Sequence, residues 1–401
     1  MNINHISLTN FRLFSRLDID MPRRILLLVG GNAQGKTSLL ESIYYFATYT
    51  SFQANQDRQL INFHSLKEAL AVGRMVIDFN RGEKSQRIEV RLILDSTKNG
   101  QRRMKKEILI DGVKRPVQQA LGVFNAVIFL PQMTRIIEDG PDERRRFLNL
   151  LISQKQPDYA ANLSEYAQVV SQRNALLKQI ADRHSDSSQL SFWDDLLTKR
   201  GSRLIFHRIQ TIHEIEQIAA RIHHKLTDGK EVLRILYQPS YDPLPTPKDQ
   251  YALPMDDPIS RLDFDEQKIQ QGFAASLLTL QKEEIARGVT TIGPHRDEIR
   301  FLANGVDLGI FGSRGQVRTA LLSLKLAEAR WLYEKTGHWP VLLLDEIMAE
   351  LDTQRRMDLT NYLVEFDQVL LSTTDQDYFS KDFCADNTIW FVENGLVQRR
   401  K

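Results

Sequence analysis

Residues 30–38, GGNAQGKTS, combine glycines, one lysine and two hydroxyl side chains at a spacing that suits phosphate binding. The apolar run RILLLV at 24–29 comes before them, and residues with helical spacing follow. A strand that ends in glycine-rich backbone before a helix leaves unpaired N–H groups aimed at one spot, at the positive end of the helix dipole. The sequence therefore predicts an anion site here.

The spacing Gly-x4-Gly-Lys-Thr matches the P-loop pattern, and the flanking strand and helix favour it over a glycine-rich turn with an incidental lysine. The glycines let backbone amides approach phosphate oxygens, and Lys36 places a positive charge on the β- and γ-phosphates. Thr37 offers a hydroxyl to Mg²⁺, and Ser38 can bond a nearby phosphate. The predicted nucleotide-binding loop consists of Gly30, Gly31, Asn32, Ala33, Gln34, Gly35, Lys36, Thr37 and Ser38.

A second apolar run, at 341–344, ends in Asp345 and Glu346. A parallel strand delivers its last residues to the phosphate edge of an α/β sheet. Asp345 would hold Mg²⁺, directly or through water, and Glu346 would polarise an attacking water. Acidic residues often simply end a strand, but together with the P-loop they predict hydrolysis of a nucleoside triphosphate.

The segment FGSRGQ at 311–316 precedes a long predicted helix at 317–335. Ser313 fits the N-cap of that helix, which would account for it adequately. Alternatively, Ser313 and the amides at this second helix N-terminus could hold a γ-phosphate. The residue types leave both interpretations open.

Composition places the chain among ordinary globular proteins, because 42% of its 401 residues are hydrophobic and 26% are charged. That length suggests two or three structural units. No apolar run approaches the ~20 residues of a membrane span, and the start lacks the pattern of a secretion signal, so we expect a cytoplasmic protein. The single cysteine, Cys384, excludes an intramolecular disulfide, and the nine scattered histidines argue against a zinc site.

The net charge of +2 does not by itself announce a nucleic-acid binder. Basic residues do gather at 102–106, 144–146 and 399–401. For each of these groups taken alone, a solvated surface or a frayed tail is the simpler interpretation.

The pattern of apolar residues predicts an α/β fold interrupted by a mainly helical insertion. Strands are expected over 3–21, 25–29, 71–79, 87–94 and 107–110, the last closed by the turn Asp111-Gly112. Apolar stripes over 163–180 and 193–222 predict two antiparallel helices, and further helices are expected over 265–287, 315–335 and 357–366. Six prolines between Pro239 and Pro258 predict an extended connection. The predicted domains are 1–150 and 291–401, forming the head, and 151–290, forming the helical arm.

The sequence resembles the RecF family, in the SMC-like branch of the ABC-type ATPases, over essentially its whole length. The resemblance rests on six motifs in family order: LTNFRLF at 8–14, GNAQGKTSLLE at 31–41, FLPQMTRIIEDGPDERRRFLN at 129–149, TTIGPHRDEIRF at 290–301, GSRGQVRTALLSLKLAE at 312–328 and LLLDEIMAELD at 342–352. It implies an SMC-like ATPase head with a mixed sheet and N-terminal antiparallel strands, and ATP with Mg²⁺ as cofactors.

The resemblance also assigns roles to single residues. Ser313, Gly315 and Gln316 would form the ABC signature and face the γ-phosphate bound by the other subunit. Asp352 would belong to the D-loop at 349–352, which crosses the dimer. Gln132 would sense Mg²⁺ and water, and Arg12 would contact the nucleotide. With one P-loop and one signature per chain, two complete sites require a head-to-tail homodimer held by ATP.

Two residues depart from the pattern. Thr374 stands where ABC proteins generally have a switch histidine, so we expect slow hydrolysis. Glu346 stands where many RecF-like chains have aspartate, so turnover is expected to differ from that of relatives.

The function implied by the resemblance is ATP-dependent binding to double-stranded DNA near gapped junctions, on the nucleoid. RecR, with RecO, would then help to load RecA on the single-stranded gap. A predicted hairpin carries our candidates for the DNA surface, Arg102, Arg103, Lys105 and Lys106, whereas 144–146 has acidic neighbours and could be structural.

Three other classes of protein share some of these features. A transporter's nucleotide-binding subunit would lack the NFR opening and an arm of this size. A full SMC rod would need hundreds of heptad residues. A scaffold that binds ATP without important hydrolysis is the closest alternative, but the presence of both Asp345 and Glu346 argues for hydrolysis.

Overall fold

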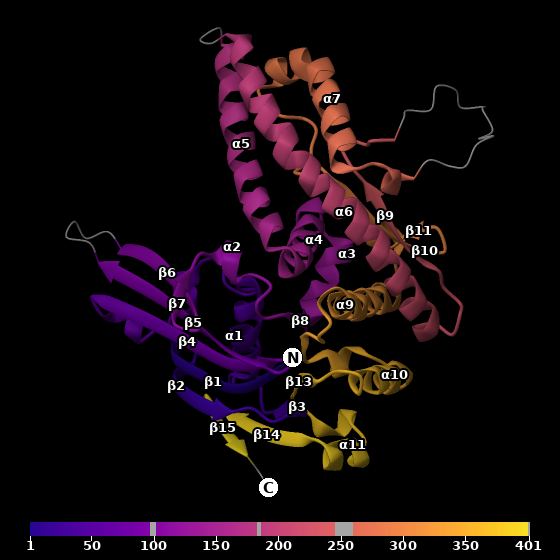
Figure 1. Ribbon diagram of the computed structural model, residues 1–401. Helices are drawn as coiled ribbons and strands as arrows, with labels where there is room; N and C mark the ends of the chain where they lie inside the picture. Colours follow the sequence, from indigo (N-terminus) through magenta and orange to yellow (C-terminus); the bar gives the residue numbers. More distant parts are fainter. Residues whose placement is uncertain (97–101, 183–185, 245–259, 400–401) are drawn as a thin grey trace. The chain divides into compact units, whose positions relative to one another are not determined.

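The computed structural model describes residues 1–96, 102–182, 186–244 and 260–399 (Figure 1). The chain folds into two compact units. The first unit combines residues 1–134 with 321–401, and the second consists of residues 135–320.

A mainly parallel sheet forms the centre of the first unit. Its strand order is β15-β14-β3-β13-β12-β8, and only β15 runs antiparallel to its neighbour. The strands are β3 (Arg24–Val29), β8 (Ala126–Phe129), β12 (Val341–Asp345), β13 (Gln368–Thr373), β14 (Thr388–Glu393) and β15 (Leu396–Arg399). Because β3, β12 and β13 are parallel neighbours, their carboxyl ends meet at one edge, as the apolar runs predicted.

The second sheet of the first unit is antiparallel, in the order β2-β1-β4-β5-β6-β7. Its strands are β1 (Asn2–Phe11), β2 (Phe14–Asp20), β4 (Leu70–Arg81), β5 (Lys84–Ser96), β6 (Arg102–Ile110) and β7 (Val113–Arg115). The predicted turn between β6 and β7 is confirmed, because Asp111 and Gly112 have φ of 49° and 81°, the left-handed pair that a type I′ turn requires.

Helix α1 (Lys36–Thr48) lies between the two sheets and packs against β8, β12 and β4. From Leu39 to Thr48 every residue is buried, which explains why its sequence shows no polar face. The other helices of this unit are α2 (Val117–Ala120), α10 (Thr353–Leu363) and α11 (Lys381–Asp386), with short 3₁₀ turns η1 (Asp57–Leu60), η2 (Ser65–Lys67), η3 (Pro131–Thr134), η6 (Ile347–Glu350) and η7 (Gln376–Tyr378). Helix α10 ends three residues earlier than predicted.

The second unit contains the predicted helical arm. Helices α5 (Pro157–Ala181) and α6 (Leu190–Leu226) run in opposite directions along each other, which confirms the predicted pair (Figure 1). Helix α7 (Glu266–Arg287) packs on both, and α9 (Arg314–Thr336) begins in this unit and ends in the first. The remaining elements are α3 (Arg135–Glu138), α4 (Pro141–Lys155), α8 (Leu308–Phe311), η4 (Ser187–Gln189) and η5 (Arg261–Asp263).

A three-stranded sheet in the second unit was not predicted. It consists of β9 (Leu233–Gln238), β10 (Glu298–Ala303) and β11 (Val306–Asp307). The six residues of β9 pair with those of β10, so this sheet crosses the domain boundary predicted at 290/291. Helix α4 packs against α5, and this contact crosses the domain boundary predicted at 150/151. The second unit is therefore wider than the predicted arm. Four of the six prolines expected in an extended connection, Pro245, Pro247, Pro254 and Pro258, lie outside the described residues.

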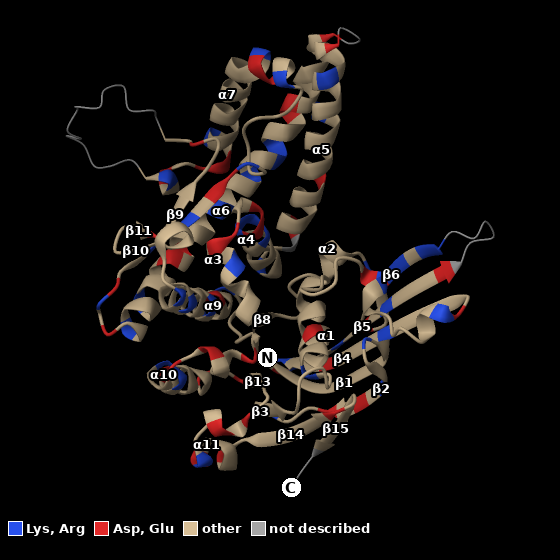
Figure 2. Cartoon of the chain, turned by 180° about the vertical axis from the view of Figure 1, so that it is seen from behind, with Lys and Arg blue, Asp and Glu red and all other residues tan. Residues whose placement is uncertain are grey.

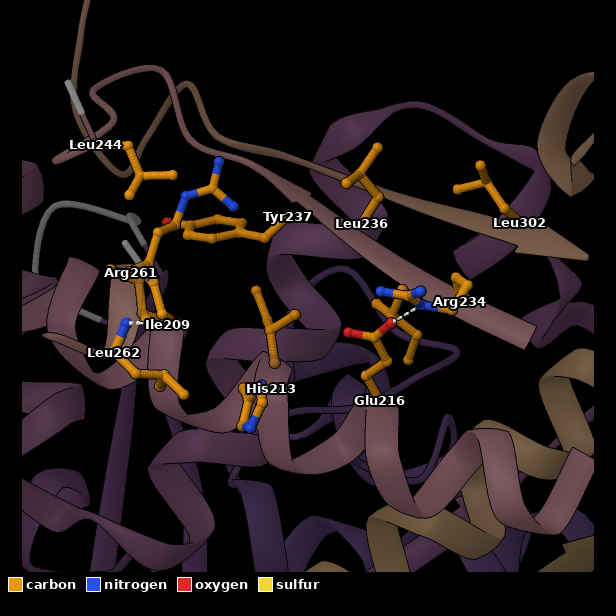
Figure 3. Close-up of a pocket in the computed structure, with 13 residues that line it drawn as sticks. Ile209, His213, Glu216, Arg234, Leu236, Tyr237, Leu244, Arg261, Leu262 and Leu302 are labelled. Atoms are coloured by element: carbon orange, nitrogen blue, oxygen red, sulfur yellow. Dashed lines mark hydrogen bonds and ion pairs between the residues drawn. The ribbon is translucent and has the colours of Figure 1, made fainter. Parts of the chain in front are cut away.

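Figure 3 shows a pocket of the second unit between α6, β9 and η5. Its walls include Ile209 and Ile212 of α6 and Leu262 of η5, and its acidic Glu216 pairs with Arg234 of β9. No glycine lines this pocket, and its one acidic residue, Glu216, is paired with Arg234, so the lining does not suit a nucleotide with its metal ion.

Candidate nucleotide-binding site

The predicted phosphate loop joins the end of β3 to the start of α1 at the carboxyl edge of the parallel sheet. Two of its glycines are required by its own geometry. A Cβ at position 30 would come within 2.2 Å of the Val392 carbonyl oxygen, and Gly35 has φ of 115° just before Lys36. Ala33 is also left-handed, with φ of 61°. The loop thus turns sharply and aims α1's first amides at its own concave side.

The turn between β14 and β15 braces this loop. Gln34 Oε1 accepts the Asn394 N–H at 2.6 Å, and the Gln34 carbonyl accepts the Gly395 N–H at 3.0 Å. Gly31, Asn32 and Ala33 remain exposed. The loop is therefore held at one end and open to a ligand along its middle.

Lys36 lies under the loop, with only 4% of its surface exposed. Its Nζ is 2.6 Å from the Gly30 carbonyl oxygen, 3.0 Å from that of Gly31 and 3.0 Å from Glu346 Oε1. An ammonium has three donors, and a buried one needs partners for all of them. Lys36 is thus fully paired by groups that border the predicted phosphate site.

Thr37 and Asp345 meet in the same place, although they are far apart in sequence. Thr37 Oγ1 donates to Asp345, at 2.8 Å from Oδ2 and 3.1 Å from Oδ1. The Ser372 hydroxyl donates to Oδ1 of the same carboxylate. Burial raises the pKa of Asp345, while the hydrogen bonds from Ser372 and Thr37 act in the opposite direction.

Glu346 follows in a left-handed conformation, with φ of 54°. Its N–H lies 3.2 Å from both the carbonyl oxygen and the hydroxyl of Ser372. Its carboxylate contacts Lys36 and accepts the Thr374 N–H at 3.1 Å. Thr374 stands where a switch histidine would be expected. Its backbone amide therefore holds the carboxylate of Glu346, the predicted catalytic residue.

The side chains fit a magnesium ion. Thr37 and Asp345 offer hydroxyl and carboxylate oxygens, the ligands that this hard cation prefers. Within the ranges that the structure describes, no group of three or more His, Cys, Asp and Glu residues could hold a metal by itself. The remaining ligands would therefore be phosphate and water oxygens, as is usual for Mg²⁺. Gln132 is exposed in η3, just after β8, the parallel neighbour of β12.

Arg12 is held by a side chain that the sequence did not single out. Its Nε and one terminal nitrogen each lie 2.8 Å from an oxygen of Glu41, which is fully buried on α1. A third nitrogen donates to the Gln59 carbonyl at 3.1 Å. A contact of Arg12 with nucleotide stays a prediction and would use its remaining donors.

The signature residues start α9, in the second unit. Ser313 and Gln316 form reciprocal bonds: the Gln316 N–H donates to Ser313 Oγ at 3.2 Å, and the Ser313 N–H donates to Gln316 Oε1 at 3.0 Å. This capping box confirms that Ser313 is the N-cap of α9, the first of its two predicted roles. Gln316 also donates to Glu231 at 2.9 Å. A Cβ at Gly315 would meet nothing closer than Ser313 Oγ at 4.0 Å, so the helix start is open.

Asp352 caps α10 in the first unit. Its carboxylate accepts the Arg355 N–H at 2.9 Å and pairs with the Arg355 guanidinium at 2.8 Å. Asp352 thus caps its own helix. Its role in a D-loop that crosses the dimer stays a prediction.

The basic candidates for DNA contact divide along β6, where Figure 2 shows Lys and Arg side by side. Arg102, Arg103 and Lys105 are exposed, and Lys105 pairs with Glu107 at 2.7 Å. Lys106 is only 22% exposed, because it pairs with Asp57 at 2.9 Å and donates to the Tyr49 carbonyl at 2.8 Å. Lys106 is thus held by protein groups, and its contact with DNA stays a prediction.

The second basic group is also mostly structural. Arg144 makes two bonds to Glu298, at 2.7 and 2.9 Å, and Arg145 donates to the Asp297 carbonyl at 2.7 Å. The third group lies partly outside the described residues, since Arg400 and Lys401 are not among them. No helix of the described ranges is both long and apolar enough for a bilayer span.

Comparison with known proteins agrees with the fold. Residues 2–396 match the family model described as RecF/RecN/SMC N terminal domain. Proteins called DNA replication and repair protein RecF, from Halothermothrix orenii and Chloroflexus aurantiacus, are 33% and 35% identical; the alignments cover 100% and 99% of this chain and 100% and 99% of theirs.

Solved structures extend the agreement to three dimensions. A structure of the recombination mediator protein RecF with ATP, from the RecFOR pathway, aligns with a TM-score of 0.81 at 28% identity over 100% of this chain and 98% of that one. The Smc head domain of Pyrococcus furiosus, at 15% identity and a TM-score of 0.51, shares the fold. The predicted SMC-like α/β head is thereby confirmed, and the chain belongs to the RecF family of DNA replication and repair proteins.

Proposed function

We propose that this chain is an ATP-dependent, double-stranded DNA-binding protein of recombinational repair that acts as a homodimer and hydrolyses ATP slowly. One observation carries the proposal: next to the phosphate loop, Lys36 contacts Glu346 and Thr37 donates to Asp345. Each belongs to a type that phosphoryl transfer from ATP requires.

ATP binding would exchange partners around Lys36. The β- and γ-phosphate oxygens would replace the Gly30 and Gly31 carbonyls and the Glu346 carboxylate as acceptors for Nζ. Thr37 and Asp345 would supply two oxygen ligands to Mg²⁺, whose charge offsets that of the phosphates. Glu346, released from Lys36 but still held by Thr374 N–H, would then face the water that attacks the γ-phosphorus.

Hydrolysis would follow from that arrangement. The water oxygen forms a bond to the γ-phosphorus while the bond to the bridging oxygen of ADP breaks, and Glu346 accepts the proton that the water loses. Slow turnover is expected because Thr374 offers Glu346 only a backbone amide. DNA would stimulate this weak activity by stabilising the dimer in which both sites are complete.

The dimer would form around two ATP molecules. Ser313, Gly315 and Gln316 lie at an open helix start, and the partner's γ-phosphate would bind there as an anion at a helix N-terminus. Next to them, Ile310 and Phe311 are 63% and 74% exposed, which suits burial in an interface. Asp352 would contribute to the same interface, and hydrolysis would release it. Gln132 would instead sense Mg²⁺ and water at the nucleotide site.

DNA binding would use the exposed basic side chains of β6. Arg102, Arg103 and Lys105 from each subunit would contact the phosphate backbone without reading bases. Because the structural relative belongs to the RecFOR pathway, we infer that the ATP-bound dimer recruits RecR, with RecO, near gapped junctions so that RecA loads on the gap. The protein would act in the cytoplasm, on the nucleoid.

Sedimentation of the full chain on a short duplex tests this function. With ATP we expect a complex of two subunits per duplex, and without ATP, or with Lys36→Met, no such complex. Lys282→Met, which removes an exposed lysine of α7, serves as the matched control. Equal DNA binding in all conditions would overturn the proposed ATP-dependent dimer. Dimerisation on DNA without any phosphate release would instead favour the ATP-bound scaffold.

A further inference from the structure

We propose that Ser372, near the end of β13, is a positioning residue for ATP hydrolysis, because its side chain contacts both members of the predicted acidic pair. The inference rests on the proposed function, since it concerns the same site. Ser372 is 1% exposed, so its hydroxyl can be satisfied only by protein groups.

Strand register places this hydroxyl. β12 and β13 are parallel neighbours, and Asp345 pairs with Ser372. Ser372 Oγ donates to Asp345 Oδ1 and accepts the Glu346 N–H at 3.2 Å. A hydroxyl has one donor and two acceptor sites, so the two bonds are compatible. One side chain thus joins the predicted metal ligand to the backbone of the predicted base.

The first effect of Ser372 concerns the direction of the Asp345 carboxylate. Ser372 and Thr37 bond this group from two sides, and Thr37 lies nearest to Oδ2. With Oδ1 fixed by Ser372, rotation of the carboxylate is restricted and Oδ2 stays beside the hydroxyl that would share the metal. Partners behind metal ligands typically change metal affinity or activity by about 10- to 100-fold when removed.

The second effect concerns the backbone of Glu346. Its left-handed conformation, with φ of 54°, is uncommon for a residue with a Cβ and persists only where surrounding groups hold it. The Ser372 carbonyl and hydroxyl share the Glu346 N–H, and the Thr374 N–H holds the carboxylate two residues further along. The end of β13 therefore sets both the backbone and the side chain of Glu346.

The neighbouring residue shows that the role belongs to position 372 and not to every hydroxyl of the strand end. Thr373 is equally buried, but its hydroxyl donates to the Asp375 carbonyl at 2.7 Å. Side chains alternate along a strand, so only Ser372 faces the carboxylates.

The test compares Ser372→Ala and Ser372→Thr with Ser42→Ala, which removes a buried serine hydroxyl of α1 that donates only to the Leu39 carbonyl. Three quantities are measured on the full chain: binding of a fluorescent ATP analogue in EDTA, affinity of the nucleotide-loaded protein for Mn²⁺ by electron paramagnetic resonance, and kcat and KM for phosphate release.

We expect Ser372→Ala to bind the analogue in EDTA within about twofold of the parent, because the phosphate loop is intact. Its Mn²⁺ affinity, its kcat or both should fall by about 10- to 100-fold while KM changes little. Ser372→Thr, which keeps the hydroxyl, should recover most of the loss, and Ser42→Ala should match the parent.

Two results would overturn the role of Ser372. One is parental Mn²⁺ affinity and kcat in Ser372→Ala. The other is an equal loss of analogue binding in both Ser372 variants, which would show that the residue only packs the strand. Failure of the proposed function would appear elsewhere, in the parent chain, as absent binding of the analogue.

Discussion

At the scale of single residues, the site holds its charges in mutual contact. Lys36 is 4% exposed, and its ammonium lies 3.0 Å from the Glu346 carboxylate. A buried charge without a partner costs several kcal/mol, so each group stabilises the other. In the proposed function, phosphate oxygens of ATP would replace Glu346 beside Lys36, and Glu346 would become free to contact water. The ion pair would thus couple nucleotide binding to hydrolysis.

Glu346→Gln tests that coupling. Glutamine keeps the shape and can still accept the Thr374 N–H, but it has no negative charge to pair with Lys36 or to take a proton. We expect phosphate release to fall about 100-fold or more, within the range that general bases contribute, while ATP still binds. The ATP-held dimer should last longer on DNA, measured by sedimentation. Glu83→Gln, in the exposed turn between β4 and β5, is the control, and unchanged hydrolysis in Glu346→Gln would refute its role as base.

At the scale of elements, the phosphate loop could be predicted because its strand, glycines and helix are contiguous. Asp345 and Glu346 could also be predicted as part of the site, because every strand of a parallel sheet has its carboxyl end at the edge where phosphate binds. Ser372 could not, because its contact depends on β13 lying directly beside β12, and the sequence does not state the strand order. Sheet β9–β11 was missed for a similar reason, since β9 finds its partner β10 only after a long helix.

Lys106 shows a second limit of sequence reasoning. It belongs to the basic run of β6, but side chains alternate between the two faces of a strand. Lys105 points toward Glu107, whereas Lys106 reaches Asp57 and lies 5.1 Å from the centre of the Tyr45 ring. The basic run is therefore divided between the two faces: Arg103 lies on the face of Lys105, whereas Arg102 lies on that of Lys106 and donates to the Leu66 carbonyl at 2.9 Å, although it stays exposed.

The start of α9 carries a prediction at the same scale. Gln316 completes a capping box with Ser313, so Gln316→Ala should weaken the first turn of the helix by about 1 kcal/mol. Amide hydrogens of that turn should then exchange about fivefold faster, measured by mass spectrometry. Gln354→Ala, in the first turn of α10, should leave α9 unchanged. Equal exchange rates in Gln316→Ala and the parent would show that the box adds no stability.

At the scale of the whole molecule, the charge balance favours the proposed binding of DNA through a local surface and through dimerisation. A net charge of +2 gives one chain little long-range attraction for a polyanion. The exposed arginines of β6 would supply a local positive field, and a dimer would supply it twice. ATP would then control DNA binding simply by controlling the number of basic surfaces held together.

This reasoning predicts a change in salt dependence when Arg102 and Arg103 are both replaced by alanine. Each lost phosphate contact should reduce the slope of log affinity against log salt concentration by about 0.9, hence by about 3 to 4 in a dimer that loses four arginines. Fluorescence anisotropy of a labelled duplex, with ATP and at several salt concentrations, gives the slope. Arg16→Ala, on β2 of the same sheet, is the control. A slope in the double variant equal to that of the parent would show that DNA does not bind through these arginines of β6. Equal reductions of the slope in the double variant and in Arg16→Ala would show that the sheet contributes only a diffuse charge.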